Sequence, residues 1–403
     1  MPSPTSSRFT SLDVSGCELD IYSCGYEPIP GFFGFPFEIA NGMFSSDIWK
    51  EDISNCSLNT TYCTSTLPYG SIDFCPILDS TFEGAPSDFD YSWLNITSFN
   101  RNSKRHYGAN LSETFKNTSK TEYDLTKTKI QEFLNSHDVN DTFYGIKLDF
   151  TFRYCDKAET ITLFDISNNP KDDIILGQSV FEGCTNLKTI NNLDKCKLSN
   201  ITHRLFKGCT NLKIEPYYIK KFIGPMVKKD DANEAFCECD FSNINYTVDL
   251  SDVEGKSFNG YRAFESSNIK KFIYDTVPLT DETMMSSWGV DNMFKHTPIE
   301  YCDLTGAGKL YLPNEYGPDS GIRGLFEQCN KLKTLIIDSV AGRDRYNGDD
   351  LDWRDKLIFI NCTSLKTIII NDKSSGSIQI DILRSFLSAC ELDADNIDIR
   401  FKS

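Results

Sequence analysis

Apolar and polar positions alternate in a pattern that recurs from residue 152 to the end of the chain. A phenylalanine is followed three residues later by a cysteine, then by a leucine, and then by a short run of alternating apolar side chains. Four copies keep every position: Phe181, Cys184 and Leu187; Phe206, Cys209 and Leu212; Phe326, Cys329 and Leu332; Phe359, Cys362 and Leu365. Weaker copies begin at Phe152, Phe236, Phe264, Phe294 and Phe386. Because successive copies are 25 to 33 residues apart, we expect an α/β solenoid of about nine repeats, each burying its apolar face against its neighbours.

The alternation within each copy predicts one strand per repeat. Successive residues of a strand face opposite sides of the sheet, so every second side chain points outward. By this count the outward positions are Thr162, Lys213, Lys271, Ile273, Tyr301, Asp303, Thr334, Ile336, Thr367 and Ile369. Two long loops carry Tyr316, Tyr346 and Trp353. We expect the outward positions and these loops to form a binding surface, because long loops of repeat proteins gather on one face.

The first part of the chain has a different character. Residues 1–122 contain no copy of the pattern, and eight of the fifteen prolines lie within the first 86 residues, which predicts loops with short strands. An aromatic segment there is either the core of a small domain or a patch that docks on another subunit; it contains Phe32, Phe33, Phe35 and Phe37. We assign residues 1–122 to an N-terminal attachment domain, 123–144 to a helical cap starting at Asp124, and 145–403 to the repeats.

Composition narrows the classes of function. The 403 residues carry a net charge of −17, and 39% of them are hydrophobic. A folded acidic protein lacks the basic face that phosphate binding needs, so we expect no nucleic-acid partner. No apolar run reaches membrane-spanning length, and the N-terminus has no segment of signal-peptide type. We therefore expect neither a membrane span nor conventional export.

The fifteen cysteines do not indicate a disulfide framework. Six of them share one position of the repeat: Cys155, Cys184, Cys209, Cys239, Cys329 and Cys362. Ser267, Thr297 and Ala389 replace cysteine there, which a disulfide or a metal would not tolerate, so we expect buried, unpaired thiols. The four histidines lack metal-ligand spacing, the acidic loop 338–355 is either solvated or a calcium site, and no catalytic motif occurs. We expect no cofactor, no metal and no enzyme activity.

The repeat resembles the leucine-rich repeats of the BspA-like type, over about residues 145–403. Similar repeats occur in proteins encoded by tailed phages of gut bacteria. The resemblance implies a curved α/β solenoid whose exposed sheet binds proteins, carbohydrates or cell surfaces. Here the repeat spacing is less regular than in that family, and the first 120 residues match no family pattern.

These observations lead to three hypotheses. The first is a non-enzymatic virion structural protein of a phage tail, fibre or other appendage. Present in many copies, it would attach to other virion proteins through residues 1–122 and contact a host protein or glycan through the repeats. The second is a cell-surface adhesin of a bacterium or protist, which would need an export route. The third is an enzyme with its active site in residues 1–122.

Overall fold

The chain has a mixed α/β fold with mainly parallel sheets. The computed structural model describes residues 11–13, 57–59, 91, 97–101, 104–136, 142–167, 173–228, 232–252, 260–275, 284–285, 290–312, 322–342, 355–372 and 377–402. The chain divides into two compact units, unit 1 (Met1–Ser199) and unit 2 (Asn200–Ser403). This division differs from the boundaries that we placed at residues 122 and 144.

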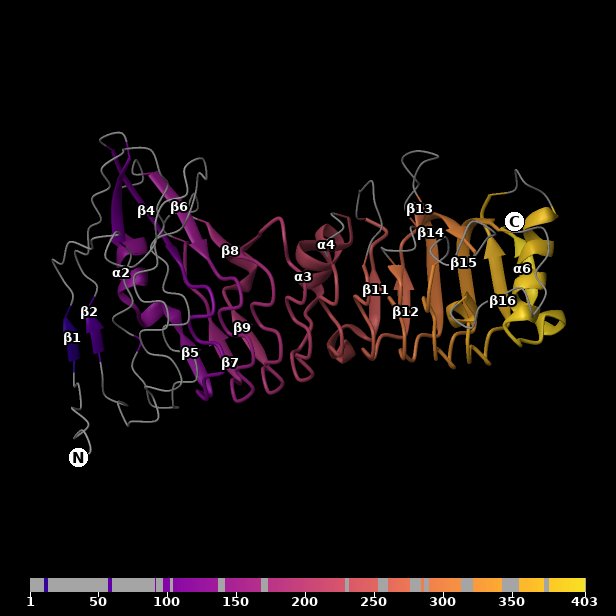
Figure 1. Ribbon diagram of the computed structural model, residues 1–403, viewed down its shortest axis with the longest axis horizontal. Helices are drawn as coiled ribbons and strands as arrows, with labels where there is room; N and C mark the ends of the chain where they lie inside the picture. Colours follow the sequence, from indigo (N-terminus) through magenta and orange to yellow (C-terminus); the bar gives the residue numbers. More distant parts are fainter. Residues whose placement is uncertain are drawn as a thin grey trace, which may run out of the picture. The chain divides into compact units, whose positions relative to one another are not determined.

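Unit 1 contains three sheets of short strands (Figure 1). A five-stranded sheet has the order β10-β8-β6-β4-β3, a three-stranded sheet has the order β5-β7-β9, and β1 pairs with β2. All these pairs are parallel except β3 with β4. The elements are β1 (Ser11–Asp13), β2 (Ser57–Asn59), β3 (Thr97–Arg101), β4 (Lys104–Asn110), β5 (Glu122–Asp124), η2 (Leu125–Lys127), α2 (Lys129–Ser136), β6 (Thr142–Lys147), β7 (Thr160–Thr162), β8 (Ile174–Leu176), β9 (Thr189–Asn191), η3 (Leu193–Lys195) and β10 (Lys197–Leu198).

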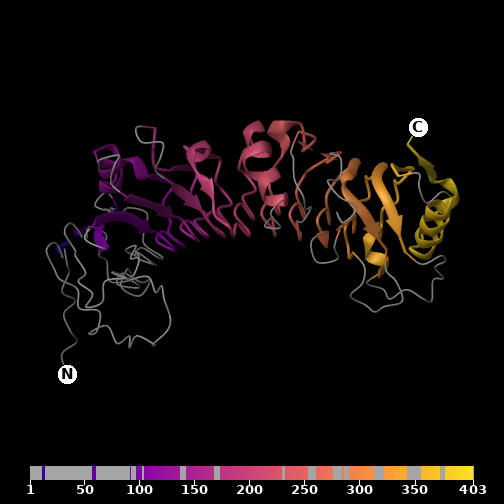
Figure 2. The same cartoon turned by 90° about the horizontal axis from the view of Figure 1, so that it is seen from above.

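Unit 2 contains one seven-stranded sheet in which every pair is parallel (Figures 1 and 2). The order is β11-β12-β14-β15-β16-β17, and β13 also pairs with β14. The elements are α3 (Pro216–Tyr218), η4 (Ile219–Ile223, a π-helix), α4 (Gly224–Lys228), η5 (Ser242–Ile244), β11 (Thr247–Asp249), β12 (Lys271–Ile273), β13 (Met284–Met285), β14 (Tyr301–Tyr311), β15 (Thr334–Ala341), η6 (Asp355–Ile358), β16 (Thr367–Ile370), α6 (Ile378–Ala389), η7 (Ala394–Asn396) and β17 (Asp398–Phe401).

The repeated phenylalanines stack ring on ring inside each unit. In unit 2 the rings from Phe206 to Phe359 follow one another with centroids 5.4 to 6.0 Å apart. The last predicted copy differs, because Phe386 lies in helix α6 and meets Phe359 edge-on. The repeated leucines are buried as expected. From Phe206 to Phe326, each ring is therefore covered by the stacked ring of the next copy, which removes apolar area from water.

The ring stack of unit 1 extends before residue 145. Phe115, Phe152 and Phe181 stack with centroids 5.3 and 5.9 Å apart. Phe115 lies in the range that we assigned to the attachment domain. The pattern missed it because Thr118 stands three residues later in place of cysteine.

Most turns around a stacked phenylalanine hydrogen-bond to the next turn, always in the same direction. The N–H of Phe236 donates to the carbonyl of Ala263 at 2.9 Å, and the N–H groups of Glu234 and Glu238 donate to the same following turn. Glu234 and Glu238 have positive φ, as do the residues two before and two after most of the other phenylalanines. Alternating right- and left-handed residues align the N–H groups on one side, and this alignment forms the one-way ladder.

The repeated cysteines are buried free thiols that bridge successive turns. This confirms the expectation of unpaired thiols for all six. Five of them donate from Sγ to the backbone carbonyl of the phenylalanine in the preceding turn, at 2.9 to 3.2 Å: Cys155, Cys184, Cys239, Cys329 and Cys362. Thr118 and Thr297 instead donate to the phenylalanine carbonyl of their own turn, both at 2.7 Å. The Ser267 hydroxyl is buried and meets no hydrogen-bond partner among the described atoms.

The predicted cap helix forms, but in two parts. Asp124 accepts from the N–H of Thr126 at 3.1 Å and so caps η2, and α2 follows after a break at Thr128. Ile130 and Leu134 are buried, as the spacing predicts. The side chain of Gln131 exchanges two hydrogen bonds of 2.8 Å with the backbone of Asp165, which fixes α2 to the segment after β7.

Candidate functional site

Eight of the ten predicted outward positions lie in the seven-stranded sheet of unit 2. Its strands pair in register, so equivalent positions of neighbouring strands lie side by side. The first row is Lys271, Tyr301, Thr334 and Thr367, and the second row is Ile273, Asp303, Ile336 and Ile369. We call these eight residues the two-row face. Edge strand β17 extends both rows with Asp398 and Arg400, exposed charges that discourage another strand from pairing there.

The two-row face is only partly open to solvent. Lys271 is exposed and Thr334 is half-buried. Two of the predicted outward positions, Asp303 and Ile336, are covered: their side chains are 5% and 8% exposed. Thr305 turns back over Asp303 and donates its N–H and its hydroxyl to the Asp303 carboxylate at 3.0 and 2.7 Å.

The remaining side chains combine a cation, a ring, hydroxyls and aliphatic groups. The ammonium of Lys271 lies 5.2 Å from the centroid of the Tyr301 ring, within the range of a cation–π contact. Burial, followed by the charges of Asp303 and Asp275, raises the pKa of Tyr301, so its hydroxyl keeps its proton. Half-buried Ile273 and Ile369 flank this polar group. Such a mixture favours recognition of an amphipathic surface over acid–base chemistry.

The other predicted site residues lie elsewhere. Thr162 is on β7 of unit 1, where its hydroxyl accepts from the Asn191 amide at 2.9 Å. Lys213 is exposed but not in a strand, and helix α3 starts three residues later at Pro216. Seven further residues are outside the described part of the chain: Phe32, Phe33, Phe35, Phe37, Tyr316, Tyr346 and Trp353.

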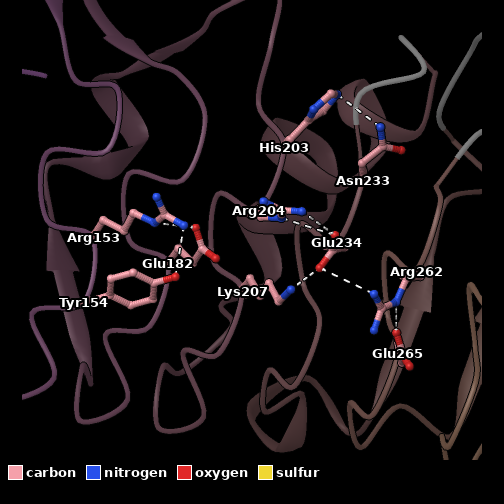
Figure 3. Close-up of polar contacts among 10 residues, drawn as sticks. All are labelled: Arg153, Tyr154, Glu182, His203, Arg204, Lys207, Asn233, Glu234, Arg262 and Glu265. Carbon is pink, nitrogen blue, oxygen red and sulfur yellow. Dashed lines mark hydrogen bonds and ion pairs between the residues drawn. The ribbon is translucent and has the colours of Figure 1, made fainter. Parts of the chain in front are cut away.

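A cluster of charges that the sequence analysis missed surrounds Glu234 in unit 2 (Figure 3). Arg204 donates to Glu234 at 3.0 Å, Lys207 donates to its other oxygen, and Arg262 lies 4.0 Å away while pairing with Glu265. Burial alone would raise the pKa of Glu234, but hydrogen bonds from Lys207 and Arg204 bring it below its usual value. The three cations and two carboxylates nearly balance, so the cluster joins successive turns and offers little charge to a ligand.

Unit 1 has a related pair. The Arg153 guanidinium lies 2.9 Å from the buried Glu182 carboxylate and stacks on the Tyr154 ring, 4.6 Å from its centroid (Figure 3). In both units the paired side chains come from adjacent turns. A comparison of equivalent positions one repeat apart would have found these pairs in the sequence, since Arg204 and Glu234 occupy the same position of successive copies.

The buried thiols are unsuited to nucleophilic chemistry. Burial raises the pKa of Cys155 and of Cys329 to about 11, so both are neutral thiols at physiological pH, and only the thiolate is a strong nucleophile. Within the described ranges, no three His, Cys, Asp or Glu side chains are grouped closely enough to hold a metal ion. Every helix in those ranges is too short or too polar to span a bilayer.

Comparison with known proteins identifies no relative. The chain matches no protein-family model, no curated protein and no solved structure.

Proposed function

We propose that this protein is a non-enzymatic binding protein built as a leucine-rich-repeat solenoid of the BspA-like type. The stacked phenylalanines, the one-way ladder between turns and the in-register parallel strands support this architecture. In a solenoid each copy contacts only its neighbours, and every one of these interactions joins successive copies. The sheet then presents one row of side chains per strand position, which is the usual arrangement of a repeat-protein binding surface.

The two-row face is the observation that carries the binding proposal. It holds a cation against an aromatic ring, half-buried threonines and half-buried isoleucines in one plane. Partly exposed apolar side chains cost little when a partner covers them. A protein surface or a glycan of a host cell satisfies both the hydroxyls and the apolar groups.

We place this binding protein in a virion, as part of a phage tail, fibre or other appendage. The ten described cysteines are all free and buried, which fits folding in a reducing cytoplasm before release by lysis. In this proposal residues 1–122 attach to other virion proteins and the protein is present in many copies. An exported adhesin and an enzyme with its active site in residues 1–122 are the alternatives, and no described contact favours either.

Substitution on the sheet tests the binding surface. We choose Thr334→Glu with Thr367→Glu, because both threonines are half-buried neighbours in the first row. The matched control is Thr210→Glu with Thr363→Glu, two exposed threonines at turns of the same unit. We expect the sheet variant to lose adsorption to host cells at least tenfold while the control keeps it and both unfold at the same urea concentration. Equal adsorption by the two folded variants would contradict the proposal.

Cross-linking mass spectrometry on purified particles tests the location. Cross-links from lysines in residues 1–122 to tail or capsid proteins, with few from the repeats, are expected for an attached arm. Cross-links from the repeats to the same proteins would indicate an internal scaffold. A particle preparation without the protein would return the adhesin to first place.

A further inference from the structure

The repeated cysteines occur in neighbouring copies. The residues at the cysteine position are, in chain order, Thr118, Cys155 and Cys184 in unit 1, and Cys209, Cys239, Ser267, Thr297, Cys329, Cys362 and Ala389 in unit 2. Inside the units the cysteines form three pairs from adjacent turns: Cys155 with Cys184, Cys209 with Cys239, and Cys329 with Cys362. We call these six residues the paired thiols. Each of them is buried and has a second buried thiol in an adjacent turn.

The backbone holds the two turns of a pair at a spacing that a disulfide accepts. One residue before Cys329, the N–H of Gln328 donates to the carbonyl of Ile360 at 2.9 Å, and a second hydrogen bond of 3.0 Å joins the same two turns beyond Cys362. Extended backbones joined in this way lie roughly 4.7–4.9 Å apart. A disulfide needs Cα atoms about 4.4–6.8 Å apart. The turns of Cys329 and Cys362 can therefore be bridged without a movement of the backbone.

The two threonines at this position show how near the side chains of adjacent turns come. The Thr297 hydroxyl lies 3.5 Å from the Sγ of Cys329, and the Thr118 hydroxyl lies 3.4 Å from the Sγ of Cys155. In both cases the hydroxyl and the thiol of the next turn donate to one phenylalanine carbonyl, at 2.7 and 2.9 Å. The hydroxyl points to the carbonyl of its own turn, whereas the thiol points to the preceding turn. A cysteine that rotates about its Cα–Cβ bond into the threonine orientation therefore brings its sulfur against the next thiol.

A bond between two such thiols leaves no phenylalanine carbonyl without a donor. The Phe326 carbonyl accepts from the thiol of Cys362 at 3.2 Å and also from the N–H of Cys329 at 3.0 Å. The Phe294 carbonyl, which the thiol of Cys329 would leave, keeps the N–H and the hydroxyl of Thr297 at 3.0 and 2.7 Å. A disulfide here therefore replaces weak thiol hydrogen bonds without the cost of an unpaired buried group.

We propose that the paired thiols are an oxidative lock, in which each pair forms a disulfide between successive turns when the chain meets a small-molecule disulfide. The thiolate of one cysteine attacks the small disulfide, forms a mixed disulfide and releases one small thiol. The second cysteine attacks the protein sulfur of the mixed disulfide and releases the other small thiol. Two protein thiols thereby lose two protons and two electrons, and the small disulfide accepts them as it becomes two thiols.

Burial keeps the paired thiols reduced until the surroundings become oxidising. Burial raises the pKa of Cys155 and of Cys329 to about 11, so few thiolates form at neutral pH. In a reducing cytoplasm cellular thiols reverse any bond that forms. In oxidising surroundings the exchange favours the disulfide, and its rate follows the local opening of the turns. This lock goes beyond the proposed function and uses no residue of the two-row face.

Thiol mapping of the full chain tests the lock. One sample is the native chain with oxidised glutathione at about pH 8, where more thiol is ionised. The other is the reduced, unfolded chain refolded in a mixture of reduced and oxidised glutathione, where burial does not limit access. After alkylation of free thiols and digestion, we expect mass spectrometry to find the three predicted pairs as linked peptides. The urea midpoint should rise and return when dithiothreitol reduces the bonds, since a cross-link restricts the unfolded chain.

Two variants test the geometry. Thr297→Cys places a thiol where the hydroxyl lies 3.5 Å from the Sγ of Cys329, so a bond between positions 297 and 329 should appear. Cys362→Ala leaves Cys329 without a thiol in either adjacent turn, so Cys329 should be recovered free or as its glutathione adduct.

The inference is overturned if the refolded chain yields the paired thiols unlinked, or linked to cysteines outside their pairs such as Cys302 or Cys390. It is also overturned if the bonds form but leave the urea midpoint unchanged, or if Thr297→Cys gives no new bond. Adsorption to host cells is a separate readout, so the lock and the proposed function can fail independently.

Discussion

Substituting Ser267 by cysteine should stabilise the protein. Ser267 stands in the position where five cysteines bridge to the preceding phenylalanine carbonyl at 2.9 to 3.2 Å, yet its shorter side chain makes no described hydrogen bond. A buried hydroxyl without a partner costs about 1–3 kcal/mol. Cysteine removes that cost and supplies a weak donor that reaches the Phe236 carbonyl.

We expect Ser267→Cys to raise the free energy of unfolding by about 1–2 kcal/mol, most of the cost that the unpaired hydroxyl imposes. For a unit of this size that corresponds to a rise in melting temperature of roughly 2–8 °C. Urea unfolding followed by circular dichroism under reducing conditions measures the change. An unaltered slope against urea would show that the substitution acts on stability and leaves cooperativity intact.

Two controls separate the hydroxyl from the size of the side chain. Ser267→Ala removes the same hydroxyl without filling its volume, so it should be stabilising, by less than Ser267→Cys. Cys239→Ser, in the preceding turn, breaks the thiol bridge to Phe206 and should destabilise by about 1–3 kcal/mol, because it buries an unpaired hydroxyl. The reasoning is refuted if Ser267→Cys and Ser267→Ala both lower stability, or if Cys239→Ser has no effect.

Three further predictions concern the turns. Burial raises the pKa of Asp291 to about 6 despite a hydrogen bond from the Arg323 N–H. The stability that the protonated Asp291 contributes is therefore present below about pH 4 and lost as the pH rises through 6. Asp291→Asn should flatten the pH dependence of the urea midpoint between about pH 4 and 8, and a profile parallel to that of the unmodified protein would contradict this. Gly183→Ala should lower the free energy of unfolding by about 1–3 kcal/mol, because φ is +75° and a Cβ would overlap the Tyr154 ring. Calorimetry of the double variant with Tyr154→Ala should show part of this stability restored. If the two substitutions lower stability independently, the overlap is excluded. Glu234→Gln should destabilise by about 1–2 kcal/mol in urea titrations, because a neutral amide oxygen accepts more weakly from the partly exposed Arg204 and Lys207. A change below about 0.5 kcal/mol would show that these ion pairs contribute as little as exposed surface pairs.

The ring stack and the strand register could be predicted because residues that recur at one position of the repeat are buried in the same way in each copy. A phenylalanine that recurs with a cysteine three residues later and a leucine three further on must occupy equivalent environments, and these residues are indeed buried throughout. The same periodicity placed Lys271, Tyr301 and Thr334 side by side before any contact was known. Free thiols followed from the replacement of cysteine by serine and threonine at one position.

Several features were decided only by the tertiary structure. The pattern could not show that Asp303 and Ile336 are covered. The alternation along a strand assigns each side chain to one face of the sheet, but it does not say what packs on that face. It also missed Phe115, whose turn carries threonine in place of cysteine. The alternation predicts a strand position at Lys213, but no strand forms there and a helix starts at Pro216. Proline in the first turn is a helix-start signal that the alternation does not take into account.

The charge cluster around Glu234 shows why the sequence predicts burial but does not predict which polar groups meet. Its members come from three successive copies, and aligning the copies pairs Arg204 with Glu234 but does not give their distance or the burial of Glu234. Their pKa values and energies depend on turns about thirty residues apart being brought within a few ångströms, and this proximity is produced by stacking of the phenylalanines. Sequence by itself determined which side chains are buried, because burial follows local polarity and period. The structure decided which charges and hydroxyls meet, because that depends on distances between turns.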